Sequence, residues 1–125
     1  MRSDKTLKTW YNKINRRFFH GTLPSNICVR WISEEDLEED EKLEEDNSGL
    51  AWKDDIESRH YGTIVISNDL RNDWRLAIAI LVHEMCHVAT DFRDEHGPAF
   101  EEWRRIIGER GIFRKSAIYK GLTIF

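Results

Sequence analysis

Cysteine is scarce in this sequence of 125 residues, which contains only Cys28 and Cys86. One lies in a predicted strand and the other in a predicted helix, and neither belongs to a C-x-x-C pair. This pattern excludes a disulfide-rich scaffold and predicts two reduced thiols, as in a cytoplasmic protein. We expect Cys86 to be a small buried apolar residue, and a role as metal ligand is the less favoured alternative.

Long apolar runs are also absent. No N-terminal segment resembles a signal peptide, and no run of apolar residues is long enough to cross a membrane. There is no internal repeat, and the length suits one domain with a modest core. The sequence therefore predicts a single cytoplasmic domain over residues 1–125, without contact to a membrane and with a monomer as the favoured state.

Charge is unevenly distributed along the chain. Residues 34–46 contain ten acidic residues and one lysine, hence a net charge of −9; the whole chain carries −4, which leaves +5 for the remainder. We interpret this run as a solvated loop insertion. The alternatives are a lid that repels nucleic acid or a selector for basic substrates.

The most informative motif is the H-E-x-x-H pattern at residues 83–87, which follows seven consecutive apolar residues. In a helix, His83 and His87 lie one turn apart on the same face, so both imidazoles can bind one ion. Zn²⁺ suits such a site because it accepts imidazole ligands and leaves a position for water. Glu84 lies beside that face, and we expect its carboxylate to take a proton from this water.

A buried helix that merely carries these polar residues is the alternative. Residues 74–90 contain few charges, and a helix that is apolar on all sides is usually buried. Burying two imidazoles and an ionised carboxylate without a partner would be costly. The metal interpretation is therefore favoured over a metal-free structural domain.

A third ligand is available in His96, nine residues after His87. Gly97 can end one element, and Pro98 can occupy the first turn of the next helix. That helix is predicted over residues 99–110 from an apolar stripe at helical spacing, formed by Phe100, Trp103 and Ile107. We prefer His96 as the third ligand, with Glu101 or Glu102 as alternatives.

The remaining elements complete an α+β fold. Residues 3–19 read as a helix capped by Ser3 or Asp4, and residues 26–33 as a strand with one well-buried face. Residues 49–53 and 61–67 read as two further, antiparallel strands, after which Asn72 or Asp73 can cap the metal helix. The expected fold is an N-terminal helix, a small three-stranded antiparallel or mixed sheet, the buried metal helix and a following helix. An extended peptide can bind by main-chain pairing at a sheet edge, so one of these two strands should flank a cleft for a peptide.

Three further candidates are weaker. Basic residues on the first helix offer a nucleic-acid contact, although a solvated face is favoured: Lys5, Lys8, Lys13, Arg16 and Arg17. His60 is expected to be an exposed loop residue rather than a participant in the reaction. Tyr119 is a candidate for hydrogen bonding to a tetrahedral intermediate.

The chain resembles the SprT-like (Spartan-type) zinc metalloproteases, whose core is H-E-x-x-H followed by His-Gly-x-x-Phe. The resemblance rests on residues 83–103, HEMCHVATDFRDEHGPAFEEW, and upstream on residues 18–24, FFHGTLP, and residues 29–31, VRW. It extends from about residue 7 to about residue 110 and implies a zincin-like catalytic core. Family members commonly carry a C-terminal zinc ribbon, which this sequence lacks.

This resemblance implies a zinc-dependent metalloendopeptidase, with Zn²⁺ on His83, His87 and His96 and with Glu84 as the catalytic base. It further implies substrates that are proteins bound or crosslinked to DNA, hence a part in DNA–protein crosslink repair, with single-stranded or double-stranded DNA as activator. The alternative is a zinc-stabilised binding module for nucleic acid or a protein partner that cleaves nothing. Glu84 weighs against this alternative, because a purely structural zinc site needs no general base and closes its fourth position.

Overall fold

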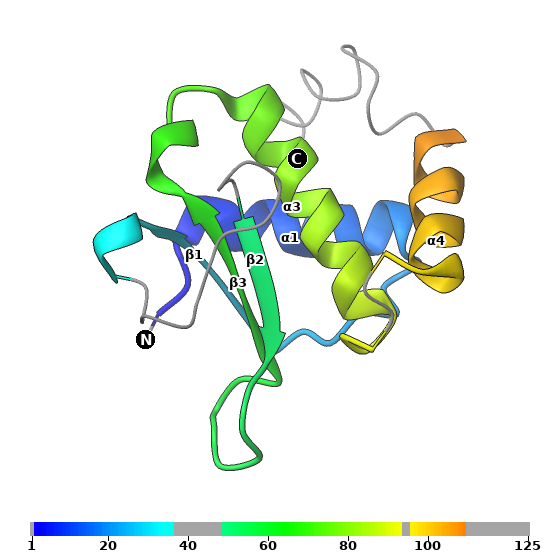
Figure 1. Cartoon of the computed structure of the whole chain (residues 1–125), viewed down its shortest axis with the longest axis horizontal. Coiled ribbons are helices and arrows are strands. Elements are labelled where there is room, and N and C mark those ends of the chain that lie inside the picture. The colour runs from blue at the N-terminus through cyan, green and yellow to red at the C-terminus, as the bar shows by residue number, and fades with distance from the viewer. Residues whose placement is uncertain (1, 37–48, 94–95, 110–125) are drawn as a thin grey trace.

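The computed structural model describes residues 2–36, 49–93 and 96–109 (Figure 1). The elements in chain order are α1 (Lys5–Phe18), β1 (Ile27–Ile32), η1 (Glu34–Asp36), β2 (Gly49–Lys53), β3 (Gly62–Ser67), η2 (Asn68–Leu70), α3 (Trp74–Ala89) and α4 (Pro98–Glu109), η denoting a 3₁₀ turn. They confirm the expected α+β fold. The acidic run beyond Asp36 and the candidate Tyr119 lie outside the described residues.

The three strands form a mixed sheet in the order β1-β3-β2. The expected antiparallel pairing of β2 with β3 is confirmed, with Gly49 opposite Ile66. In contrast, β1 joins β3 in parallel, with Ile27 opposite Gly62. β3 is therefore the central strand, and β2 is an edge of the described sheet, which decides which of the two candidate strands is available to a substrate.

One face of the sheet forms the main core against α1 and α3. Successive side chains of a strand point to opposite faces, so Ile27, Val29, Ile64 and Ile66 share this face and pack on the two helices. In Figure 1, α4 lies beyond α3, away from the sheet. Its Trp103 ring contacts Phe19 at the end of α1, with ring centroids 5.1 Å apart. α3 is thus enclosed by other elements.

The opposite face of the sheet is more buried than the sequence indicated. The strand at residues 26–33 was predicted to have one well-buried face, yet Cys28 and Ile32 on its other side are also buried. Ile32 forms a second, smaller apolar cluster with Val65 and the partly buried Leu50 and Trp52. The cause is the central position of β3, whose residues are buried on both faces.

At the start of α1, Asp4 rather than Ser3 is the capping residue. The Asp4 carboxylate caps the helix by accepting a hydrogen bond from the Leu7 backbone N–H at 3.0 Å. Ser3 instead uses its hydroxyl to accept the backbone N–H of Val29 in β1, at 2.9 Å. Together these contacts attach the N-terminus of α1 to the sheet.

Lys8 is not available for binding on the predicted basic face of α1. Its half-buried ammonium donates to the backbone carbonyls of Ser25 and Ile27, so it holds the segment before β1 in place. Burial lowers the pKa of Lys8 relative to its ordinary value. None of the described helices combines the length and apolar character needed to cross a membrane.

Candidate metal centre

α3 carries His83, Glu84 and His87 into the interior. Asp73 caps the helix by accepting the Leu76 backbone N–H at 3.2 Å, so the cap is Asp73 rather than Asn72. Between Ala77 and Val88 the helix is largely buried, as its apolar sequence predicts, although Leu76 in the first turn is 42% exposed. A helix held on several sides keeps its polar side chains in fixed positions.

A tight turn ends α3 and sends the chain back toward it. The Phe92 backbone N–H donates to the His87 carbonyl at 2.8 Å, and the Asp91 N–H donates to the Val88 carbonyl at 2.9 Å. Asp91 and Phe92 both have left-handed backbones, with φ of 54° and 61°. This conformation reverses the chain direction and allows His96 to approach the helix.

The three histidines meet in one cluster. The Nε2 atom of His96 lies 3.1 Å from that of His87 and 3.1 Å from that of His83. One ligand atom from each residue lies within 4.8 Å of those of the other two. His87 is buried, His83 is partly exposed and His96 is exposed, so the cluster opens to solvent on one side. The structure therefore brings together the three residues that the sequence suggested as ligands.

Phe100 of α4 supports all three imidazoles from one side. Its ring centroid lies 5.0 Å from that of His83, 4.6 Å from that of His87 and 4.7 Å from that of His96. Phe100 itself is buried. The apolar stripe of its helix predicts only a core position for Phe100, whereas its place in the His-Gly-x-x-Phe pattern indicates a position near the third histidine.

Glu84 lies directly beside this cluster. Its carboxylate is fully buried, and its Oε1 atom is 3.9 Å from the Nε2 atom of His83. On the other side, Glu84 borders the start of β2, because a Cβ atom added at Gly49 would lie 3.4 Å from Glu84 Cγ. The carboxylate is thus held between the histidines and the edge strand, where a base for water is needed.

The donor set fits Zn²⁺. A tetrahedral zinc ion with Zn–N distances of about 2.0–2.1 Å separates its ligand nitrogens by about 3.3 Å. The two Nε2–Nε2 distances of 3.1 Å are close to this value. Three neutral imidazoles with one side open to solvent leave room for a fourth, non-protein ligand, as catalytic zinc sites do.

The alternative ligands lie elsewhere. Glu101 and Glu102 are exposed and pair with Arg104 and Arg105 on the surface of α4. Cys86 is fully buried in the core, and burial raises the pKa of its thiol to about 12. Its thiol is not part of the cluster of ligand atoms that the described residues form. These positions favour His96 over the other candidates.

A set of contacts that the sequence did not reveal connects the turn after α3 with the sheet. The Asp91 carboxylate accepts a hydrogen bond from the Tyr61 hydroxyl and lies 3.5 Å from the Lys53 ammonium and 3.4 Å from the Arg93 guanidinium. The hydrogen bond from Tyr61 is the main reason why the pKa of Asp91 lies below its ordinary value. The two neighbouring cations lower it further. No local pattern signals a pair that lies 30 residues apart in the chain.

Gly62 allows this turn to approach the sheet closely. A Cβ atom at Gly62 would lie 2.7 Å from the Trp52 carbonyl oxygen and 2.8 Å from the Phe92 ring. We therefore expect Gly62→Ala to lower the free energy of unfolding by about 1–3 kcal/mol, the usual cost of overpacking. Thermal or urea unfolding measures this loss. Gly21→Asn serves as control, because a Cβ atom added at Gly21 would meet no atom within 4 Å beyond its chain neighbours. Equal stability of Gly62→Ala and the wild type would contradict the close packing.

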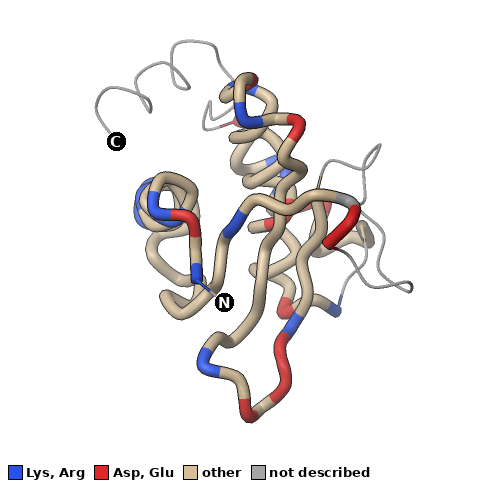
Figure 2. The backbone as a smooth tube through the Cα atoms, turned by 90° about the vertical axis from the view of Figure 1, so that its left-hand side faces the viewer, with Lys and Arg blue, Asp and Glu red and all other residues tan. Residues whose placement is uncertain are grey.

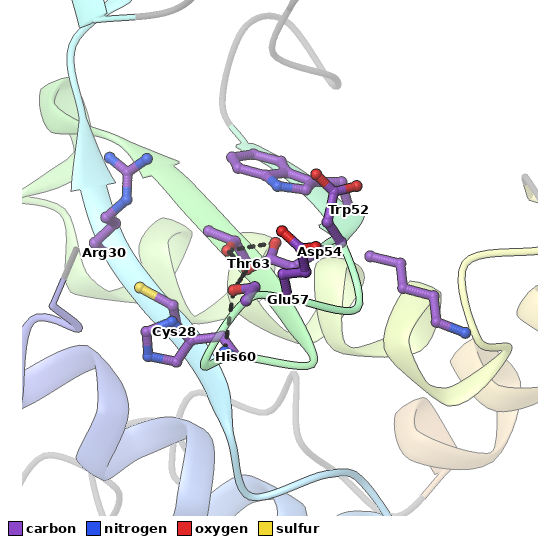
Figure 3. A pocket seen from close by; sticks show the side chains of 10 residues that line it. Cys28, Arg30, Trp52, Asp54, Glu57, His60 and Thr63 are labelled. Atoms are coloured by element: carbon purple, nitrogen blue, oxygen red, sulfur yellow. Dashed lines mark hydrogen bonds between the residues drawn. The ribbon is translucent and has the colours of Figure 1, made fainter.

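His60 belongs to a different part of the molecule. It is half-buried and lines a cleft of 560 Å³ together with Cys28 and Thr63, on the sheet face opposite α3 (Figure 3). The Thr63 hydroxyl donates to Asp54 at 3.0 Å, and the His60 backbone N–H donates to Ser58 Oγ at 3.1 Å. The β2–β3 loop thus folds onto this second face. His60 is therefore a loop residue away from the three-histidine cluster, as predicted, but it is half-buried rather than exposed.

Comparison with known protein families matched this chain to the SprT-like family. The family model covers residues 7–119, which is most of the chain. This range includes the three histidines and Glu84 as well as the strands β2 and β3. Searches against curated proteins and against solved structures found no match. The family is generally linked to zincin-like metallopeptidases, in agreement with the geometry of the cluster. The chain belongs to the SprT-like family.

Proposed function

We propose that this protein is a zinc-dependent metalloendopeptidase. The observation that supports this most strongly is the combination of three convergent histidine Nε2 atoms with the buried carboxylate of Glu84 beside them. A purely structural zinc site would close its coordination with a fourth protein ligand and would have no use for a buried base. Open coordination and an adjacent base are together typical of hydrolysis.

The roles of the residues follow from their positions. His83, His87 and His96 would hold the metal, and Phe100 would keep their rings in place. Zinc in this position supplies Lewis-acid chemistry, which makes water nucleophilic near neutral pH and polarises a peptide carbonyl. Glu84 would accept the proton of the attacking water and then deliver it to the leaving amine.

β2 is the strand best placed to hold a substrate. It is an edge of the described sheet, and it runs beside α3 at the level of the base. A Cβ atom at Gly49 would lie 2.6 Å from Ile80 Cγ2 and 3.4 Å from Glu84 Cγ, so this strand begins in contact with the metal helix. An extended peptide that pairs with the outer edge of β2 would pass next to Glu84, bound through its main chain and with little sequence selectivity.

We propose proteins bound or crosslinked to DNA as substrates, with DNA as activator. Figure 2 shows Lys and Arg positions on the side of α1 that faces away from the sheet. With Lys8 engaged by backbone carbonyls, Lys5, Arg16 and Arg17 are the exposed basic residues of this face. Phosphate binding by such residues would make stimulation by DNA strongly dependent on salt.

Removing the metal provides the direct test of the proposed function. Chelation should lower peptide hydrolysis about 1,000-fold or more, because the metal contributes several kcal/mol of charge stabilisation. One equivalent of Zn²⁺ should restore the rate, whereas Mg²⁺ should not, since imidazole suits zinc and oxygen ligands suit magnesium. The assay would use a denatured protein substrate with and without single-stranded DNA. A chain that binds zinc but does not cleave the substrate, either with or without DNA, would support the alternative, a zinc-stabilised binding module.

A further inference from the structure

The path from α3 to the third histidine is attached to the sheet at two neighbouring residues. The Asp91 carboxylate accepts the Tyr61 hydroxyl, and the Phe92 ring packs on Gly62. The rings of Tyr61 and Phe92 are 6.4 Å apart. Asp91 and Phe92 lie between His87 and His96 in the chain. Tyr61, which directly precedes β3, and Gly62, the first residue of β3, are therefore neighbouring partners of this turn.

Tyr61 is itself held firmly. Its backbone N–H donates to the Asn26 carbonyl at 2.9 Å, and its carbonyl accepts the Asp54 N–H at 3.1 Å. The Lys53 ammonium lies over its ring, 5.0 Å from the centroid. These contacts connect Tyr61 to the segments next to both other strands, so its hydroxyl is presented from a fixed point.

The turn needs such an external contact. Asp91 and Phe92 adopt left-handed backbone conformations in succession, which cost about 1–2 kcal/mol at a residue such as Phe92 and less at Asp91. Strained conformations of this kind persist where the surroundings impose them. Besides the backbone hydrogen bonds of the turn and the cations near Asp91, the hydroxyl of Tyr61 and the packing against Gly62 oppose this cost.

We propose that Tyr61 is a positioning residue for the metal centre: its hydroxyl holds Asp91 and thereby keeps the turn in the conformation that returns His96 to His83 and His87. The proposal rests on the proposed metal-binding function. Tyr61 would not touch the metal or the substrate. It would act through the turn and would couple the sheet to the third ligand.

Tyr61→Phe removes this hydroxyl and keeps the ring. We expect the variant to bind Co²⁺ or Zn²⁺ with unchanged stoichiometry but roughly tenfold more weakly, the lower end of the usual effect for residues that orient metal ligands. A competition titration with a chromophoric chelator measures the affinity, and the visible absorption of the Co²⁺ form reports the ligand geometry. Both readouts are independent of peptidase activity.

Tyr11→Phe is the matched control. The Tyr11 hydroxyl also donates to a loop carbonyl, that of Pro24, at 2.6 Å, but this contact does not involve the turn after α3. This control should lower the melting temperature of the metal-free protein without changing metal affinity. If Tyr61 merely stabilised the fold, both variants would behave alike in both measurements.

Asp91→Asn tests the other partner without removing its backbone preference, because asparagine tolerates the left-handed conformation. The effects of Tyr61→Phe and Asp91→Asn on metal affinity should be less than additive in the double variant, since both act through the same contact. Full additivity would overturn the proposed route from Tyr61 to His96.

Amide hydrogen exchange on metal-free protein separates this proposal from the proposed function. Tyr61→Phe should accelerate exchange at residues 90–93 and leave α1 unaffected, because the released turn opens locally. Unchanged exchange together with unchanged metal affinity would overturn the positioning role. A wild-type chain that binds no metal would refute the metalloprotease instead, and the exchange result would then still decide whether Tyr61 holds the turn.

Discussion

Replacing Glu84 by glutamine is expected to lower the rate of peptide hydrolysis about 100- to 10,000-fold, the usual contribution of a general base, while the chain still folds and binds zinc. The amide has nearly the size of the carboxylate, so the space between His83 and the start of β2 stays filled. It cannot accept the proton of the attacking water. The measurements are single-turnover hydrolysis, zinc stoichiometry and the melting temperature of the same preparation.

Glu102→Gln is the matched control for this substitution. Glu102 is an exposed carboxylate on α4 that pairs with Arg105 on the surface, so its loss should leave the rate unchanged. If Glu84→Gln and the wild type hydrolysed the substrate equally fast, Glu84 would not be the base. The open coordination would then be the remaining support for the peptidase hypothesis.

Loss of His96 should weaken zinc binding roughly 100- to 1,000-fold. Structural zinc sites with four ligands provide about 10–16 kcal/mol, hence about 2.5–4 kcal/mol for each ligand, and every 1.4 kcal/mol is a factor of ten. His96 lies 3.1 Å from each of the other two imidazoles, measured between Nε2 atoms, and the three histidines are the ligand cluster found among the described residues. Calorimetry or chelator competition measures the change in affinity.

Two variants separate the lost ligand from the altered backbone. His96 has a left-handed backbone with φ of 59°, which alanine tolerates poorly and asparagine tolerates better. His96→Ala and His96→Asn should therefore lose similar affinity for zinc, while only His96→Ala should also lose stability without metal. Glu101→Gln should keep full affinity. Full retention of zinc by both His96 variants would show that the third ligand is a different residue.

The parts of this protein that could be predicted from the sequence are those with local signals. The apolar run before His83 and the i, i+4 spacing to His87 identified α3 and two members of the cluster. Gly97 and Pro98 marked the boundary before α4, which begins at Pro98. For the cap of α1 the sequence left Ser3 and Asp4 open, since the choice depends on a distant group: Ser3 accepts a hydrogen bond from Val29 in β1, and Asp4 caps the helix.

Features that depend on long-range contacts could not be predicted. Parallel pairing of β1 with β3 brings together strands that are separated in the chain by the whole of β2. The burial of Cys28 and Ile32 follows from that pairing. The link from Tyr61 to Asp91 joins the residue before β3 to the turn after α3, and no sequence pattern pairs these two residues. In each case the contacting residue lies far away in the sequence, and no hydrophobic periodicity indicates which residue it is.

The zinc content of the purified chain, determined by elemental analysis against protein concentration, tests the central claim most directly. The open three-histidine site predicts one zinc per chain in the wild type and in Glu84→Gln, and substoichiometric zinc in His83→Ala and His87→Ala. Absence of zinc from a wild-type chain purified without chelators and then supplied with Zn²⁺, or equal zinc content in the histidine variants, would contradict it.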